Sequence, residues 1–83
     1  MESAQRRGLA RLMLRWPDRR ELLARRARED THVGELCEAY ESACNAVEHW
    51  LRSPASVAQD RILEYRGLVK ATEEDILSMI SRS

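Results

Sequence analysis

The hydrophobic pattern is clearest over residues 31–52, where apolar side chains recur with the spacing of an α-helix. Heptad positions a and d hold Val33, Leu36, Tyr40, Ala43, Val47 and Trp50, and positions e and g add Cys37, Ala39, Cys44, Ala46 and Leu51. This apolar arc covers about four positions in seven, which is wider than the seam of a two-stranded coiled coil. We therefore predict a helix over 31–52, capped by Asp30, that packs against more than one neighbour.

A second long helix is predicted over residues 54–81, with Ser53 as its N-cap and Pro54 in its first position. Its positions a and d hold Ala55, Ala58, Ile62, Tyr65, Val69, Thr72, Ile76 and Met79, and Leu63, Leu68, Leu77 and Ile80 widen the apolar face. A short connection between two long helices makes them pack side by side in opposite directions. The predicted core is therefore a long antiparallel helical hairpin of residues 31–52 and 54–81.

The residues before the hairpin predict one or two short basic helices. A first helix is predicted over residues 5–15, and its apolar face holds Leu9, Leu12 and Met13 and continues to Trp16 directly after it. Pro17 interrupts this helix, because a residue before proline avoids the α conformation, and a second helix is expected over about 17–29. We predict one small all-α domain over 1–83, in which 1–15 is a weakly ordered or docking basic arm and 16–81 is the hairpin-containing core.

Charge is segregated along the chain although the net charge is zero. Residues 1–28 hold nine arginines and three acidic residues (+6), and residues 29–83 hold five basic and eleven acidic residues (−6). The preferred interpretation is that the two parts attract each other within one chain or between subunits. The alternative is a basic patch that binds nucleic acid or an anionic membrane surface, made of Arg19, Arg20, Arg25, Arg26 and Arg28.

Four side chains on the central helix have a symmetric spacing that suggests zinc: His32, Cys37, Cys44 and His49. Helix geometry argues against a site, because each histidine lies about 140° around the helix from the nearer cysteine. Cys37 and Cys44 are about 10 Å apart along the axis, too far for a disulfide within the helix. We expect no metal or cofactor, and we expect the cysteines to act as small apolar side chains.

Nothing in the sequence predicts an enzyme, since it has neither a phosphate-binding glycine loop nor a nucleophile motif. Four glutamates are expected to form a solvated acidic face or to receive the Arg-rich second helix: Glu35, Glu38, Glu41 and Glu48. No apolar run approaches the roughly 20 residues that span a bilayer. Arg11 and Arg15 interrupt the apolar part of the N-terminal segment, so a secretory signal is not expected. Two cysteines without a signal fit a reducing cytoplasm.

Three short motifs match a pattern seen in small helical hairpins. They are Trp16-Pro17-Asp18, Asp30-Thr31-His32 with Leu36 and Tyr40 after it, and Glu74-Asp75-Ile76-Leu77-Ser78-Met79-Ile80. Over about residues 16–81 the chain resembles the YdcH-like family of small bacterial coiled-coil proteins. It departs from the family at Glu73, where a lysine is common, and in its extra arm over 1–15. The resemblance implies a self-associating helical hairpin in a family without an established activity.

The wide apolar surface favours a non-enzymatic module for protein–protein interaction or assembly. We expect a homo-oligomer, most simply a dimer with a four-helix core. The predicted interface residues are Val33, Leu36, Cys37, Tyr40, Cys44, Val47, Trp50, Leu51, Tyr65, Val69 and Ile76. A heterologous protein partner, as for a secretion-type co-chaperone, and binding of nucleic acid or membrane through residues 6–28 remain as alternatives.

Overall fold

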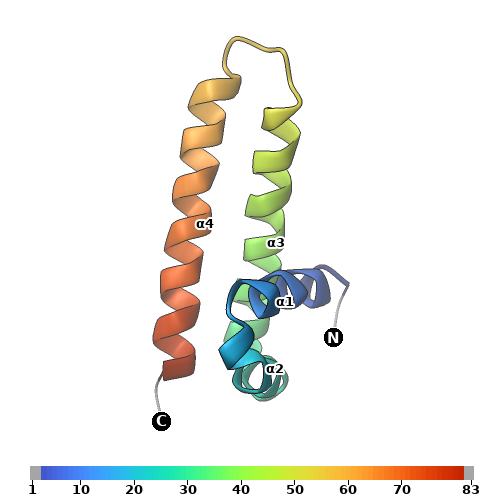
Figure 1. Cartoon of the computed structure of the whole chain (residues 1–83), viewed down its shortest axis with the longest axis vertical. Helices are drawn as coiled ribbons and strands as arrows, with labels where there is room; N and C mark the ends of the chain where they lie inside the picture. Colours follow the sequence, from blue (N-terminus) through green and yellow to red (C-terminus); the bar gives the residue numbers. More distant parts are fainter. Residues whose placement is uncertain (1–2, 82–83) are drawn as a thin grey trace.

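The computed structural model describes residues 3–81, and these residues contain helices but no strand (Figure 1). The helices are α1 (Ser3–Arg15), α2 (Arg20–Glu29), α3 (Thr31–Leu51) and α4 (Ala58–Ser81), with a short 3-10 helix, η1 (Pro17–Arg19), before α2. The predicted all-α class is therefore confirmed for the described part of the chain.

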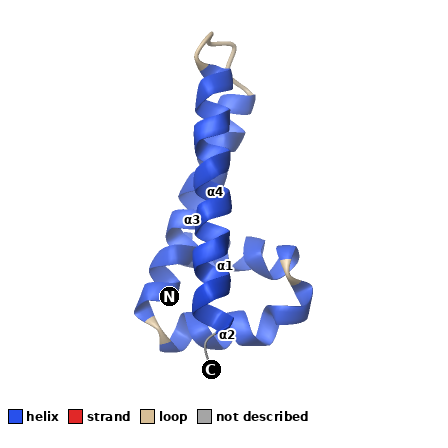
Figure 2. Ribbon diagram, turned by 90° about the vertical axis from the view of Figure 1, so that its left-hand side faces the viewer, coloured by secondary structure: helices blue, strands red, loops and turns tan. Residues whose placement is uncertain are grey.

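The two long helices, α3 and α4, run in opposite directions side by side (Figures 1 and 2). The hydroxyl of Tyr40 on α3 donates a hydrogen bond of 2.7 Å to the carboxylate of Glu73 on α4, which ties the two arms together. Asp30 caps α3 as predicted, since its carboxylate accepts a hydrogen bond of 2.9 Å from the backbone N–H of His32. The hairpin arms and the break before α3 thus follow the periodicity of the sequence.

The start of α4 differs from the prediction, because the helix begins at Ala58 and not at Pro54. The hydroxyl of Ser53 accepts a hydrogen bond of 3.2 Å from the backbone N–H of Ala55, which closes a local turn. A serine side chain can satisfy the backbone in such a turn and so compete with a helix. Pro54 therefore lies in the connection between the arms and does not open the helix.

All four α-helices contribute to one core. The fully or nearly buried side chains are Leu12 from α1, Leu23 and Ala27 from α2, Val33, Cys37 and Tyr40 from α3, and Ile76 and Ile80 from α4. Figure 1 shows α1 and α2 at the end of the hairpin where α3 begins and α4 ends. Residues 3–15 form the helix α1, which packs against α3.

A glycine sets the distance between α1 and α3. A Cβ atom built on Gly8 would lie 1.8 Å from the carbonyl oxygen of Cys37, so only a residue without a side chain fits there. In the sequence this glycine looks like a weakness, because glycine costs about 1 kcal/mol relative to alanine inside a helix. In the fold it allows the backbones of α1 and α3 to touch.

We predict that Gly8→Ala lowers the free energy of unfolding by about 1–3 kcal/mol, because the added methyl group must push α1 away from α3. Gly67→Ala is the matched control: nothing lies within 4 Å of its Cβ position, and alanine should stabilise α4 by about 0.5–1 kcal/mol. Urea unfolding followed by circular dichroism measures both. Equal effects of the two substitutions would contradict the close approach of α1 to α3.

Candidate interaction surface

Two arginines hold α1 on one side of the hairpin. The guanidinium of Arg11 donates to the carboxylate of Glu41, to Glu48 (3.1 Å) and to the side-chain oxygen of Asn45 (3.2 Å), all on α3. The guanidinium of Arg15 pairs with Glu73 at 3.3 Å, on the carboxylate oxygen that also accepts the Tyr40 hydroxyl. The side of the hairpin next to α1 is therefore closed by packing and by ion pairs.

This network changes the picture of the acidic face. The hydrogen bonds that Arg11 donates to Glu48 and then to Glu41 raise the pKa of Arg11 above its usual range, and Arg11 lowers the pKa of Glu48. Glu41 is only 4% exposed, so the prediction of a solvated face is wrong for this residue. The arginine that meets it comes from the first helix, whereas the sequence suggested the second. Glu35 and Glu38 are exposed as expected.

The opposite side of the hairpin is open. A groove of about 380 Å³ runs between α3 and α4, and we call it the open groove; it is lined by Ala39, Ser42, Ala43, Ala46, Tyr65, Leu68 and Thr72. At about 100° per residue, Ala39 and Ala46 lie roughly 160–180° around α3 from Cys37, which faces α1. Leu68 is 49% exposed and Ala39 is also exposed, so apolar atoms of both arms face water here.

The hairpin is also uncovered near its connection. We call residues 49–65 the loop end, and Figure 2 shows it clear of α1 and α2. Three large apolar side chains of the loop end are exposed: Leu51 (56%), Val57 (46%) and Leu63 (69%). At this end the hairpin consists of α3 and α4 alone, so it lacks the third helix that α1 supplies at the base.

The predicted interface residues fall into three groups. Four are buried in the core of the chain itself, where a partner cannot reach them: Val33, Cys37, Tyr40 and Ile76. Six are half-buried, and these are Leu36, Cys44, Val47, Trp50, Tyr65 and Val69, whereas Leu51 is exposed. The list lacks Ala39 and Leu68, which line the open groove. The apolar character of these two residues could have marked them as interface candidates. The sequence does not show, however, which side of α3 the N-terminal helices cover and which side they leave open.

The predicted basic patch is not gathered on one face. Arg19, Arg25 and Arg28 are exposed, whereas Arg26 is half-buried. Arg20 is exposed too, but its guanidinium donates to the backbone carbonyl of Met13 at 3.4 Å. At about 100° per residue, Arg28, Arg25 and Arg26 lie about 80°, 140° and 240° around α2 from Arg20, so these charges do not form a single stripe.

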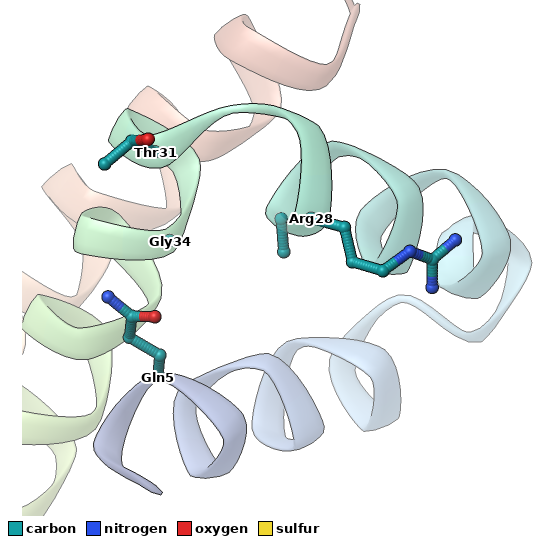
Figure 3. A pocket seen from close by; sticks show the side chains of 5 residues that line it. Gln5, Arg28, Thr31 and Gly34 are labelled. Atoms are coloured by element: carbon teal, nitrogen blue, oxygen red, sulfur yellow. The ribbon is translucent and has the colours of Figure 1, made fainter. Parts of the chain in front are cut away.

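A second cavity, of about 440 Å³, lies where α1, α2 and the start of α3 meet (Figure 3). Its lining residues are Gln5, Ala27, Arg28, Thr31 and Gly34. Figure 3 shows the guanidinium of Arg28 directed away from Gln5 and Thr31. The polar groups that line this cavity therefore do not converge on one point.

The two cysteines are free thiols with little nucleophilic character. Burial raises the pKa of Cys37 to about 11, and burial also raises the pKa of Cys44. The pKa of Tyr40 is raised as well, first by burial and then by its hydrogen bond to Glu73. All three groups are therefore neutral at pH 7, and a thiol is a far weaker nucleophile than a thiolate.

Two further findings concern residues 3–81. No three side chains among their His, Cys, Asp and Glu residues come together in a way that could hold a metal ion. None of their helices combines the length and the apolar character that crossing a bilayer requires.

The raised pKa of Cys37 predicts a loss of stability at alkaline pH. The unfolded thiol ionises near pH 9, whereas the folded thiol keeps its proton up to about pH 11, so the free energy of unfolding falls between these values. We expect a fall of about 2–3 kcal/mol by pH 11. Urea unfolding of Cys37→Ala, referred to its own stability at pH 8, should show a smaller fall that is due to Tyr40 and Cys44. The same pH dependence in both proteins would rule out this role of Cys37.

Comparison with known proteins gives no relative: no family model, no curated protein and no solved structure matches this chain. The resemblance to YdcH-like hairpins stays a prediction.

Proposed function

We propose that this protein is a non-enzymatic helical assembly module that associates with itself through the part of its hairpin that α1 and α2 leave uncovered. The observation that carries the proposal is the placement of the exposed apolar side chains. Four of the five large ones in the described chain, Leu51, Val57, Leu63 and Leu68, lie on the loop end or in the open groove. The fifth, Leu14, lies on α1.

The energetics support association of this surface. Burial of apolar area contributes about 25 cal/mol per Å², or about 1.5–3 kcal/mol for a fully buried leucine. A hairpin arm of two helices cannot cover its own apolar arc, and pairing with a second hairpin would give each arm the further neighbours that a four-helix core supplies. The wide apolar arc of α3, of which α1 covers one side, points in the same direction.

The other functional alternatives have less support in the described residues. Binding of nucleic acid or an anionic membrane surface would use the arginines of residues 6–28, but Arg11 and Arg15 pair with the hairpin and the others do not share one face. A co-chaperone role would use the same uncovered surface for a different protein. Self-association is the more economical proposal, because it needs no second component.

The proposal predicts a concentration-dependent dimer. Sedimentation velocity or light scattering after size exclusion, over a range of about 5 µM to 1 mM, should show the mass rising from 9.6 kDa toward twice that value. The midpoint is expected in the micromolar range, which is typical of small interfaces. A single species of 9.6 kDa throughout this range would contradict the proposed function.

A further inference from the structure

We propose that the occupant of the open groove is a second copy of this chain, lying antiparallel to the first about a two-fold axis that passes near Leu68. The inference rests on the proposed function and specifies which surface of the hairpin performs it. The apolar lining of the groove, and the pattern of charges along its rim, carry the argument.

The apolar part of the groove is centred on the hairpin. Leu68 lies near the middle of α4 (Ala58–Ser81), and Ala39, Ala43 and Ala46 supply small side chains across from it on α3. Small residues permit close approach of a partner helix, and the half-exposed Leu68 supplies a knob that such an approach would bury. A two-fold axis at this point would bring the same patch of both copies together, as an isologous interface requires.

The charges on the rim of α4 are placed symmetrically about Leu68. Arg61 and Asp75 each lie seven residues from Leu68, about 10.5 Å along the helix in opposite directions. At about 100° per residue they are only about 40° apart around α4, and Leu68 lies between them. Both are exposed. An antiparallel partner would therefore bring Arg61 of each copy to Asp75 of the other, which makes two matching pairs.

The rim of α3 has the same polarity. Glu35 and Glu38 are exposed toward the base of the hairpin, and His49 is exposed toward the loop end. The rim is thus acidic near the base, with Asp75 adding to it, and close to neutral near the loop end, where Arg61 lies beside Glu64. A parallel partner would place acidic end against acidic end, whereas an antiparallel partner opposes unlike ends, and like charges opposed across an interface disfavour a wrong partner geometry.

Within one chain Arg61 already pairs with Glu64, at 2.9 Å on the same helix. Both side chains are about half exposed, and an exposed pair at this spacing contributes only about 0.2–0.5 kcal/mol. Turning Arg61 toward the groove therefore costs little. The groove is short, so the interface belongs to the small and weak class, and the charge pairs determine orientation more than affinity.

A charge-exchange experiment on the full chain tests the arrangement. Arg61→Glu and Asp75→Arg should each weaken the homodimer about 5–30-fold, because each places two like-charge contacts across the two-fold axis. Mixed in equal amounts, the two variants should form a heterodimer with affinity within about threefold of the wild type, because both contacts are again between unlike charges. Sedimentation velocity with one of the two variants fluorescently labelled measures the affinity of this heterodimer.

The matched controls lie on the other side of α4. Arg66→Glu and Glu74→Arg change the charge of exposed residues by the same amounts on the side that faces α1, and they should alter the dimer little, alone or mixed. Leu68→Arg should abolish the dimer, whereas Leu14→Arg, at a more exposed position on α1 and away from the groove, should leave it intact. Circular dichroism verifies that each variant is folded.

The outcomes separate the two claims. Three results would overturn the groove as the interface while leaving self-association in place: a dimer that survives Leu68→Arg, a dimer that is lost in Leu14→Arg, or charge variants that show no preference for each other when mixed. A wild-type chain that stays monomeric would overturn both. Two results together support an antiparallel partner in the groove. Leu68→Arg abolishes the dimer, and the dimer that Arg61→Glu and Asp75→Arg each weaken is restored when these two variants are mixed.

Discussion

The fold depends on the need to cover an apolar arc on α3 that is too wide for one neighbour. α4 packs along the middle of this arc, and α1 covers the edge that carries Cys37. The second contact is possible because Gly8 lets the two backbones touch at the carbonyl of Cys37. Arg11 and Arg15 then hold α1 in place through acidic residues of both arms. Burial of Glu41 and the raised pKa values of Cys37 and Tyr40 follow from this packing.

Coverage of the arc is uneven along the hairpin, and this unevenness is the physical basis of the proposed function. At the base, α1, α2 and α4 surround α3 and bury side chains such as Val33 and Ile76 completely. Toward the loop end the arm is two helices thick, and on the side away from α1 the open groove exposes Leu68 between small residues. A partner that lies in this groove would give the outer half of the hairpin the kind of cover that α1 gives the base.

Periodicity was sufficient to predict that the helices exist, because it depends on near neighbours in the chain, but the local signals at Ser53 and Pro54 misplaced the start of α4, which begins at Ala58. The apolar spacing of residues 31–52 located α3, Asp30 marked its start, and Pro17 separated the first two helices. The features that could not be predicted depend on tertiary contacts. Gly8 looked like a weak point of a helix, and Glu41 looked solvated, because only the docking of α1 gives these residues their roles. Likewise, Ala39 and Leu68 became candidates for the interface only once the side covered by α1 was known.

The central claim is that one half of the hairpin is covered within the chain and the other half is covered by association. Hydrogen–deuterium exchange at two protein concentrations tests it most directly, because amide protection reports local opening along each helix. We expect strong protection of residues 33–37 that does not change with concentration, and weaker protection of residues 46–51 and 61–72 that rises as the protein is concentrated. Equal protection along both arms in dilute solution, unchanged on concentration, would contradict this account.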